Sequence, residues 1–186
     1  MKNRFLKIAG LVLGVLLLSS GTYLGGLQLT GNFHEVISGQ LYRSGQLTAP
    51  QLATYVGQHG IKTIINLRGH SDSDWYAQEV AEADRLGVGH VDFQMSARKE
   101  LTPARARELI ALLKDVPKPV LIHCQAGADR SGLVSSLYLE QIANASEEVA
   151  EQQLSFAFGH IGIRYLSSTI AMDDSWEKLQ NSNLGG

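Results

Sequence analysis

One stretch of the chain combines a thiol, a guanidinium and a hydroxyl at short spacings: Cys124, five further residues, Arg130 and then Ser131. An apolar run at 120–122 precedes the cysteine, and a helix-like segment at 133–142 follows the serine. A strand that leads into a tight loop at a helix start points backbone N–H groups and the positive helix end at one centre. The residue types and their spacing therefore predict a nest for a tetrahedral dianion.

The thiol, the guanidinium and the hydroxyl each have a predicted role in phosphoryl transfer. The positive field favours the thiolate of Cys124, which can attack phosphorus in line. Arg130 can hold two phosphate oxygens with its planar fork, and Ser131 can donate a hydrogen bond that helps the sulfur leave the phosphoenzyme. A buried, inert cysteine would not need these neighbours. The expected substrate-binding set is Gln125, Ala126, Gly127, Ala128, Asp129 and Arg130.

The loop resembles the active-site loop of the cysteine-based protein tyrosine phosphatases, in their dual-specificity branch. Two upstream stretches, at 41–46 and 60–68, fall in the order seen in small bacterial members, which include exported, biofilm-linked tyrosine phosphatases of Gram-negative bacteria. The similar region runs from 39 to 142. The resemblance implies a phosphatase that forms a phosphocysteine intermediate and needs no cofactor. Its implied substrates are phosphotyrosine, and also phosphoserine or phosphothreonine, in proteins, or a small phosphomonoester.

The resemblance also implies a carboxylic acid that protonates the leaving oxygen, and three residues are candidates. Glu100 lies on the loop upstream of the catalytic strand, where relatives carry the acid. Asp129 lies inside the cysteine loop, as in lipid-directed relatives. Asp92 precedes Cys124 by 32 residues, but its surroundings are typical of a strand. The sequence leaves the choice among the three open.

Other functions remain open at this point. The same loop could act on a phosphoinositide, lipid or sugar phosphate, because the small neutral side chains near the cysteine leave room for a bulky headgroup. A rhodanese-like sulfurtransferase also ends a strand with a catalytic cysteine, although the Arg-Ser-Gly ending argues against it. A phosphate-binding module without catalysis would not need the thiolate.

The composition of the chain argues against several other classes of protein. The chain has 186 residues, a net charge of −2 and one cysteine. The charge balance gives no support for nucleic-acid binding, and one cysteine excludes an internal disulfide framework. Six histidines are scattered without metal-ligand spacing, so we expect no metal. The oligomeric state is left open.

The N-terminal segment differs from the rest of the chain. Basic residues within the first seven positions precede an apolar run at 8–18, and no charged residue then occurs until Glu35. The run alone fits a signal peptide, whereas its weaker continuation to 29 completes a membrane span. We expect residues 1–33 to be a signal peptide or membrane anchor and residues 34–186 to be the catalytic domain. Basic residues before the run send the domain into the periplasm, tethered to the inner membrane or released after cleavage.

Alternating strands and helices predict an α/β fold with a mostly parallel sheet flanked by helices. Ligands bind at the carboxyl ends of such strands, which places Cys124, Arg68 and the loop at 96–102 in one cleft. Arg43 could reach the cleft or pair with a surface carboxylate, and we expect the carboxylate; we expect His160 to be a packing residue. The expected strands are 61–67, 88–95 and 119–123, with a hairpin in 36–47; the expected helices are 50–59, 75–86, 103–114, 133–143, 146–158 and 163–179.

Overall fold

The computed structural model describes residues 2–180, 182 and 184. Within these residues, one sheet of five strands lies at the centre, in the order β1-β2-β5-β3-β4. The first pair is antiparallel, and every other pairing is parallel. The strands are β1 (His34–Ile37), β2 (Leu41–Ser44), β3 (Thr63–Asn66), β4 (Gly89–Asp92) and β5 (Val120–His123). This arrangement confirms the predicted α/β architecture.

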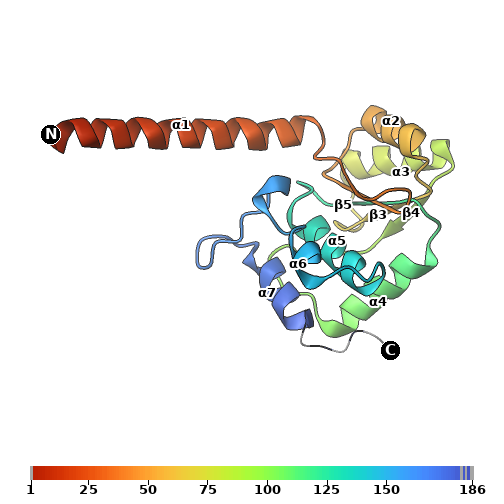
Figure 1. Cartoon of the computed structure of the whole chain (residues 1–186). Helices are drawn as coiled ribbons and strands as arrows, with labels where there is room; N and C mark the ends of the chain where they lie inside the picture. Colours follow the sequence, from red (N-terminus) through yellow and green to blue (C-terminus); the bar gives the residue numbers. More distant parts are fainter. Residues whose placement is uncertain (1, 181, 183, 185–186) are drawn as a thin grey trace.

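Helices cover both faces of the sheet (Figure 1). They are α2 (Ala49–His59), α3 (Asp74–Leu86), α4 (Pro103–Asp115), α5 (Asp129–Gln141), α6 (Glu147–Glu151) and α7 (Ile170–Gln180). On one face, α2 and α3 pack over an apolar cluster that includes Leu52, Val56 and Ala83. On the other face, α4, α5 and α7 enclose a larger cluster. The sheet is therefore the middle of three layers.

Capping residues decide where the helices begin and end. Thr48 opens α2 with a capping box to Gln51, and Gly60 closes that helix in the left-handed conformation, at φ 62°. Thr102 accepts a hydrogen bond from the backbone N–H of Arg105 at the start of α4. All four residues of β3 and of β5 are buried, as expected for central parallel strands covered on both faces.

The C-terminal part contains less helix than the sequence predicts. The expected helix at 146–158 is divided into α6 and a short 3-10 helix, η1 (Phe156–Phe158), which Gly159 ends at φ 83°. The expected helix at 163–179 begins only at residue 170, because Ser167 accepts a hydrogen bond from the backbone N–H of Thr169 before the first turn. Residues 161–169 therefore form a loop.

The N-terminal segment forms one long helix, α1 (Lys2–Leu29), which extends away from the domain (Figure 1). Its part from Leu6 to Leu29 has a mean hydropathy of 1.8 and none of its most apolar window is buried in the protein. By length and composition this helix can cross a membrane, although a signal sequence has the same properties.

Candidate active site

The carboxyl ends of the parallel strands meet at one edge of the sheet, and the cysteine loop starts there. Cys124 follows β5 directly and is buried, and five residues later α5 begins. The cysteine Sγ lies 3.6 Å from the Oγ of Ser131, in the first turn of that helix. The first turn of α5 thus places its hydroxyl beside the thiol, while the helix N-terminus faces the loop.

Glycine is required where the loop crosses the end of β2. Gly127 adopts φ 74°, and a Cβ there would lie 2.5 Å from the backbone nitrogen of Gly45 and 2.7 Å from the carbonyl carbon of Ser44. The backbone N–H of Gln46 also donates to the carbonyl oxygen of Gln125, at 3.1 Å. The loop therefore rests backbone to backbone on the neighbouring strand end, in a conformation that other residues adopt only with strain.

Arg43 holds the loop from beneath. Its guanidinium is fully buried, and Nη2 donates to the carbonyl oxygens of Gly127 and Ala128, both at 2.9 Å. Burial lowers the pKa of Arg43 to about 10, which still leaves it a cation. The expectation of a surface carboxylate partner was wrong, because β2 is an interior strand and turns this side chain under the loop.

The backbone of the loop is free to bind an anion. Arg43 takes up two of the loop carbonyls, whereas the N–H groups of residues 125–128 donate to no acceptor among the described residues. Unpaired N–H groups of this kind normally need a partner, which an anion can supply. The loop geometry is that of an oxyanion nest.

Arg130 stands at the rim of the same nest. Its Nη1 makes two long contacts, of 3.4 Å each, to the carbonyl oxygens of Leu67 and Met95. Its Nε is buried and has no hydrogen-bond partner within the described part of the chain. A buried guanidinium nitrogen without an acceptor is costly unless a ligand supplies one. The side chain is therefore tethered at one end and has a donor left for an anion.

A cavity of about 620 Å³ joins these groups. Cys124, Asp129 and Arg130 line it from the loop, residues 94–98 line it from the opposite side, and Ser168 and Thr169 close another side. Gln28, in the last turn of α1, also lines this cavity and donates to the carbonyl oxygen of Ala126.

The three candidate acids have different surroundings. Asp129 lines the cavity with the cysteine. Glu100 lines an adjoining pocket and forms an ion pair with Lys178 on α7. Asp92 accepts hydrogen bonds from Asn66 and from the hydroxyl of Tyr76, at the far side of β3. Of the three, the structure brings Asp129 together with Cys124 and Arg130.

A histidine between two carboxylates holds Asp129. His160 Nδ1 lies 2.7 Å from Oδ1 of Asp129, and Nε2 lies 2.9 Å from Oδ2 of Asp173. Burial lowers the pKa of His160, but hydrogen bonds and attraction from the two carboxylates outweigh it and raise the pKa to about 9. His160 is buried, as expected for a packing residue, but it is a cation at neutral pH and contacts a candidate catalytic group.

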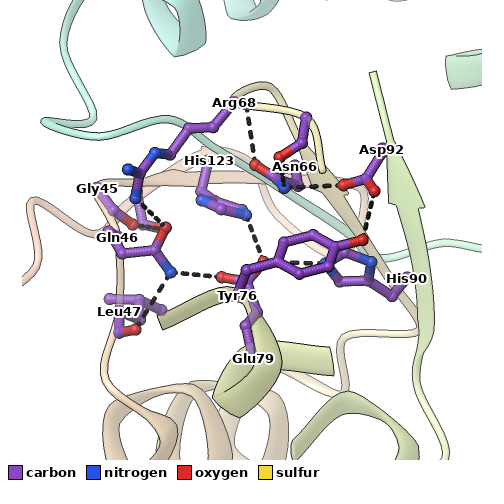
Figure 2. A network of polar contacts seen from close by, with 12 residues as sticks. Gly45, Gln46, Leu47, Asn66, Arg68, Tyr76, Glu79, His90, Asp92 and His123 are labelled. Carbon is purple, nitrogen blue, oxygen red and sulfur yellow. Dashed lines mark hydrogen bonds and ion pairs between the residues drawn. The ribbon is translucent and has the colours of Figure 1, made fainter. Parts of the chain in front are cut away.

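A second buried network supports the loop from the face of α2 and α3 (Figure 2). Glu79 on α3 accepts hydrogen bonds from Nε2 of His123 (3.0 Å), Nε2 of His90 (2.9 Å) and Nε2 of Gln46 (2.6 Å). Burial raises the pKa of Glu79, but these bonds lower it to about 2, so the group is a carboxylate. The network fixes the ring of the residue that immediately precedes the cysteine.

Comparison with known proteins agrees with this geometry. A family model described as a DSP-PTPase phosphatase fused to NAD+ kinase matches residues 30–168. The chain belongs to this phosphatase family. A search of curated proteins gave no sequence match.

Solved structures of other phosphatases share the fold of this DSP-type phosphatase. TpbA of P. aeruginosa is 20% identical with a TM-score of 0.61, and the match covers 82% of this chain and 86% of TpbA. PTPMT1 is 18% identical with a TM-score of 0.60, covering 80% and 96%. The core catalytic domain of the PP-IP phosphatase SIW14 from S. cerevisiae is 18% identical with a TM-score of 0.61, covering 81% and 91%.

Sequence reasoning missed three residues that position the loop of this DSP-type phosphatase. Arg43, Glu79 and His160 lie 81, 45 and 36 positions from Cys124 in the sequence; Arg43 belongs to the stretch at 41–46 that resembles the family, but a surface carboxylate was the partner expected for it. A charged residue in an otherwise apolar strand is the signal that could have identified Arg43, because a buried charge needs a partner. No comparable pattern marks the other two.

Proposed function

We propose that this phosphatase hydrolyses phosphomonoesters through a phosphocysteine intermediate, with phosphotyrosine in proteins as its main substrate. The observation that carries the proposal is the cavity where a thiol, a guanidinium and several backbone N–H groups meet; one guanidinium nitrogen and these N–H groups have no partner within the described part of the chain. Groups that converge on one point and lack partners in the free protein are suited to the dispersed charge of a phosphoryl group in transfer.

The reaction has two displacements at phosphorus. The thiolate of Cys124 attacks, the P–O bond to the substrate breaks, and the leaving oxygen takes a proton. Water then attacks the phosphocysteine, the S–P bond breaks, and inorganic phosphate leaves. Arg130 and the loop N–H groups hold the equatorial oxygens throughout. Ser131, 3.6 Å from the sulfur, donates the hydrogen bond that helps the thiolate depart.

In this proposal Asp129 passes a proton from protonated His160, which it contacts, to the leaving oxygen, and the carboxylate then acts as the base that activates water. It lines the cavity, His160 fixes its Oδ1, and its Oδ2 has no hydrogen-bond partner among the described residues. Glu100 would have to leave its ion pair with Lys178 to act. Asp92 accepts hydrogen bonds from Asn66 and Tyr76 at the end of β4, on the far side of β3 from Cys124.

Phosphorylated lipids or inositols are the second candidate substrates. TpbA has been solved in complex with pTyr, and PTPMT1 in complex with PI(5)P. The second candidate gains support from Gln28, because the last turn of the apolar helix α1 reaches the cavity. Arg98 and Arg130 are the basic side chains of the described cavity lining, which suits a single phosphomonoester better than a polyphosphate.

We also infer that α1 anchors the domain to the inner membrane from its periplasmic side. Tyr23 Oη donates to the carbonyl oxygen of Ala157 at 2.6 Å, and Gln28 lines the cavity. These contacts support a retained anchor over a cleaved signal peptide, with the boundary between anchor and domain close to the active site.

The test is hydrolysis of p-nitrophenyl phosphate by the reduced full chain in detergent, with Cys124→Ser and Cys124→Ala as variants. We expect the wild type to be active and both variants inactive, with a radiolabelled phosphocysteine trapped only in the wild type. Asp129→Asn, compared with the matched variant Glu100→Gln, should lose activity while the latter keeps it. An inactive wild type that transfers sulfur from thiosulfate to cyanide, or that binds phosphate without turnover, would contradict the proposal.

A further inference from the structure

The loop at 161–166 is apolar and exposed. Tyr165 is 96% exposed and Leu166 is 83% exposed, and Ile161 and Ile163 nearby are also exposed. Single exposed apolar residues are common, but a run of four within six positions at the tip of a loop marks an interaction site. The loop links η1 to α7.

The loop lies on the side of the domain from which α1 leaves. In Figure 1 both extend from the domain in the same direction. The 3-10 helix η1, which immediately precedes the loop, contacts α1 directly: the ring of Tyr23 stacks on Phe156 with centroids 5.7 Å apart. A membrane that holds α1 would therefore come close to the loop.

The length of α1 indicates how close the loop lies to the membrane surface. A bilayer core of roughly 30 Å takes about 20 helical residues. A span that starts after Lys7, the last basic residue before the apolar run, reaches its twentieth residue at Leu27, about one helical turn beyond Tyr23. Tyrosine prefers the boundary between lipid and water. The contact between Tyr23 and η1 thus lies at the membrane surface, and the loop begins three residues after η1.

The same two segments flank the mouth of the cavity. Gln28 lines it from the last turn of α1, and Ser168 and Thr169 line it from the residues that follow the apolar loop. Exposed Arg98 in the lining adds positive charge on this side, which favours anionic headgroups, whereas Arg164 in the loop is paired with Asp174.

We propose that residues 161–166 form a second membrane contact, in which Tyr165 and Leu166 enter the lipid interface beside α1. The cavity mouth then opens at the bilayer surface, and phosphate groups carried on that surface reach Cys124 without leaving it. This inference rests on the anchor role of α1 given above, and it specifies where the substrate of the proposed phosphatase is presented.

The first test measures the position of the loop without catalysis. The full chain carrying Cys124→Ser and Tyr165→Cys is labelled with bimane and reconstituted in vesicles of phosphatidylethanolamine and phosphatidylglycerol. We expect a blue-shifted emission that lipids with a doxyl group on the acyl chain quench. Ala111→Cys, on the exposed side of α4, is the matched control and should give unquenched, water-like emission. Equal quenching at the two positions, or none at either, would overturn the proposal.

The second test compares soluble and surface-bound substrates. Tyr165→Glu and Leu166→Glu change exposed side chains, so we expect p-nitrophenyl phosphate to be hydrolysed at the wild-type rate. Hydrolysis of a phosphotyrosine linked by a short spacer to a vesicle lipid should fall several-fold, whereas Ala111→Glu should leave both rates unchanged. Equal surface rates in all variants would refute the orientation of the cavity. Failure of the wild type on the soluble substrate would instead contradict the proposed phosphatase function, which the bimane measurement does not test.

Discussion

Replacement of His160 by glutamine should destabilise the protein in a pH-dependent way. The two carboxylates around His160 raise its pKa from 6.5 to about 9 in the folded state. A tenfold change in proton affinity corresponds to about 1.4 kcal/mol, so protonated His160 contributes roughly 3 kcal/mol. His160 itself is buried, but Asp129 and Asp173 are partly exposed, so screening by solvent reduces the contribution to about 2–3 kcal/mol.

The direction in which stability changes with pH follows from the number of protons that the folded and unfolded states bind. The folded pKa lies above the unfolded one, so the folded state binds more protons between pH 6.5 and 9 and its stability falls as pH rises. The contribution is complete below pH 6.5 and is lost as pH passes about 9. Glutamine cannot be protonated, so the difference in free energy of unfolding between wild type and His160→Gln should shrink by 2–3 kcal/mol, about the full contribution, from pH 6 to pH 9.5.

Urea unfolding in mild detergent, followed by tryptophan fluorescence, measures this difference. Trp176 on α7 is buried and reports the unfolding of the side of the domain that carries Asp173. His70→Gln is the matched control, because His70 is exposed and the substitution should leave the pH dependence unchanged. A wild-type to His160→Gln difference that stays constant from pH 6 to 9.5 would refute the reasoning.

Three further predictions concern the support of the loop. Arg43→Met should fold but lower kcat on p-nitrophenyl phosphate by about a hundredfold, because the carbonyls of residues 127 and 128 lose their donor and the loop shifts; an unchanged kcat would contradict this role. Gly127→Ala should lower the free energy of unfolding by about 1–3 kcal/mol, because the new Cβ meets the backbone of Gly45. The variant should also lose the protection that phosphate gives against thermal unfolding. A variant that phosphate protects as well as the wild type would disprove the contact. Glu79→Gln should lower the free energy of unfolding by about 3 kcal/mol at pH 7, because the pKa of Glu79 is lowered from 4.5 to about 2 in the folded state. This contribution is present above pH 4.5 and is lost as pH falls through 2. Urea unfolding should therefore give a smaller difference between wild type and variant at pH 3 than at pH 7.

The short-range features of this chain could be predicted from sequence. The loop from Cys124 to Arg130 is a local motif whose flanking apolar run and helix are adjacent in the chain, so its place between a strand and a helix could be predicted from the sequence pattern. Gly60 and Pro103 likewise mark helix boundaries that the structure confirms. In each case the deciding interactions connect residues a few positions apart.

The remaining features depend on contacts between distant segments. Arg43 reaches the loop because β2 and β5 are neighbours in the sheet, a pairing that strand order along the chain does not reveal. His160 meets Asp129 because the loop after α6 folds back over the start of α5. The helix predicted to begin at residue 163 begins at residue 170 instead, and the apolar side chains of the preceding loop face solvent and not the core.

The isolation of Cys124 has a consequence for redox chemistry. The chain contains one cysteine, and its sulfur sits in the nest beside Ser131. Many redox-sensitive thiols are protected by a second cysteine, which captures the sulfenic acid as a disulfide before further oxidation. Here no intramolecular thiol exists to do so, and the sulfenic acid must be rescued by a backbone nitrogen or by an external thiol that enters the cavity. In an oxidising compartment, the rate at which peroxide inactivates this protein is therefore expected to depend on how often phosphate or substrate occupies the nest and shields the sulfur.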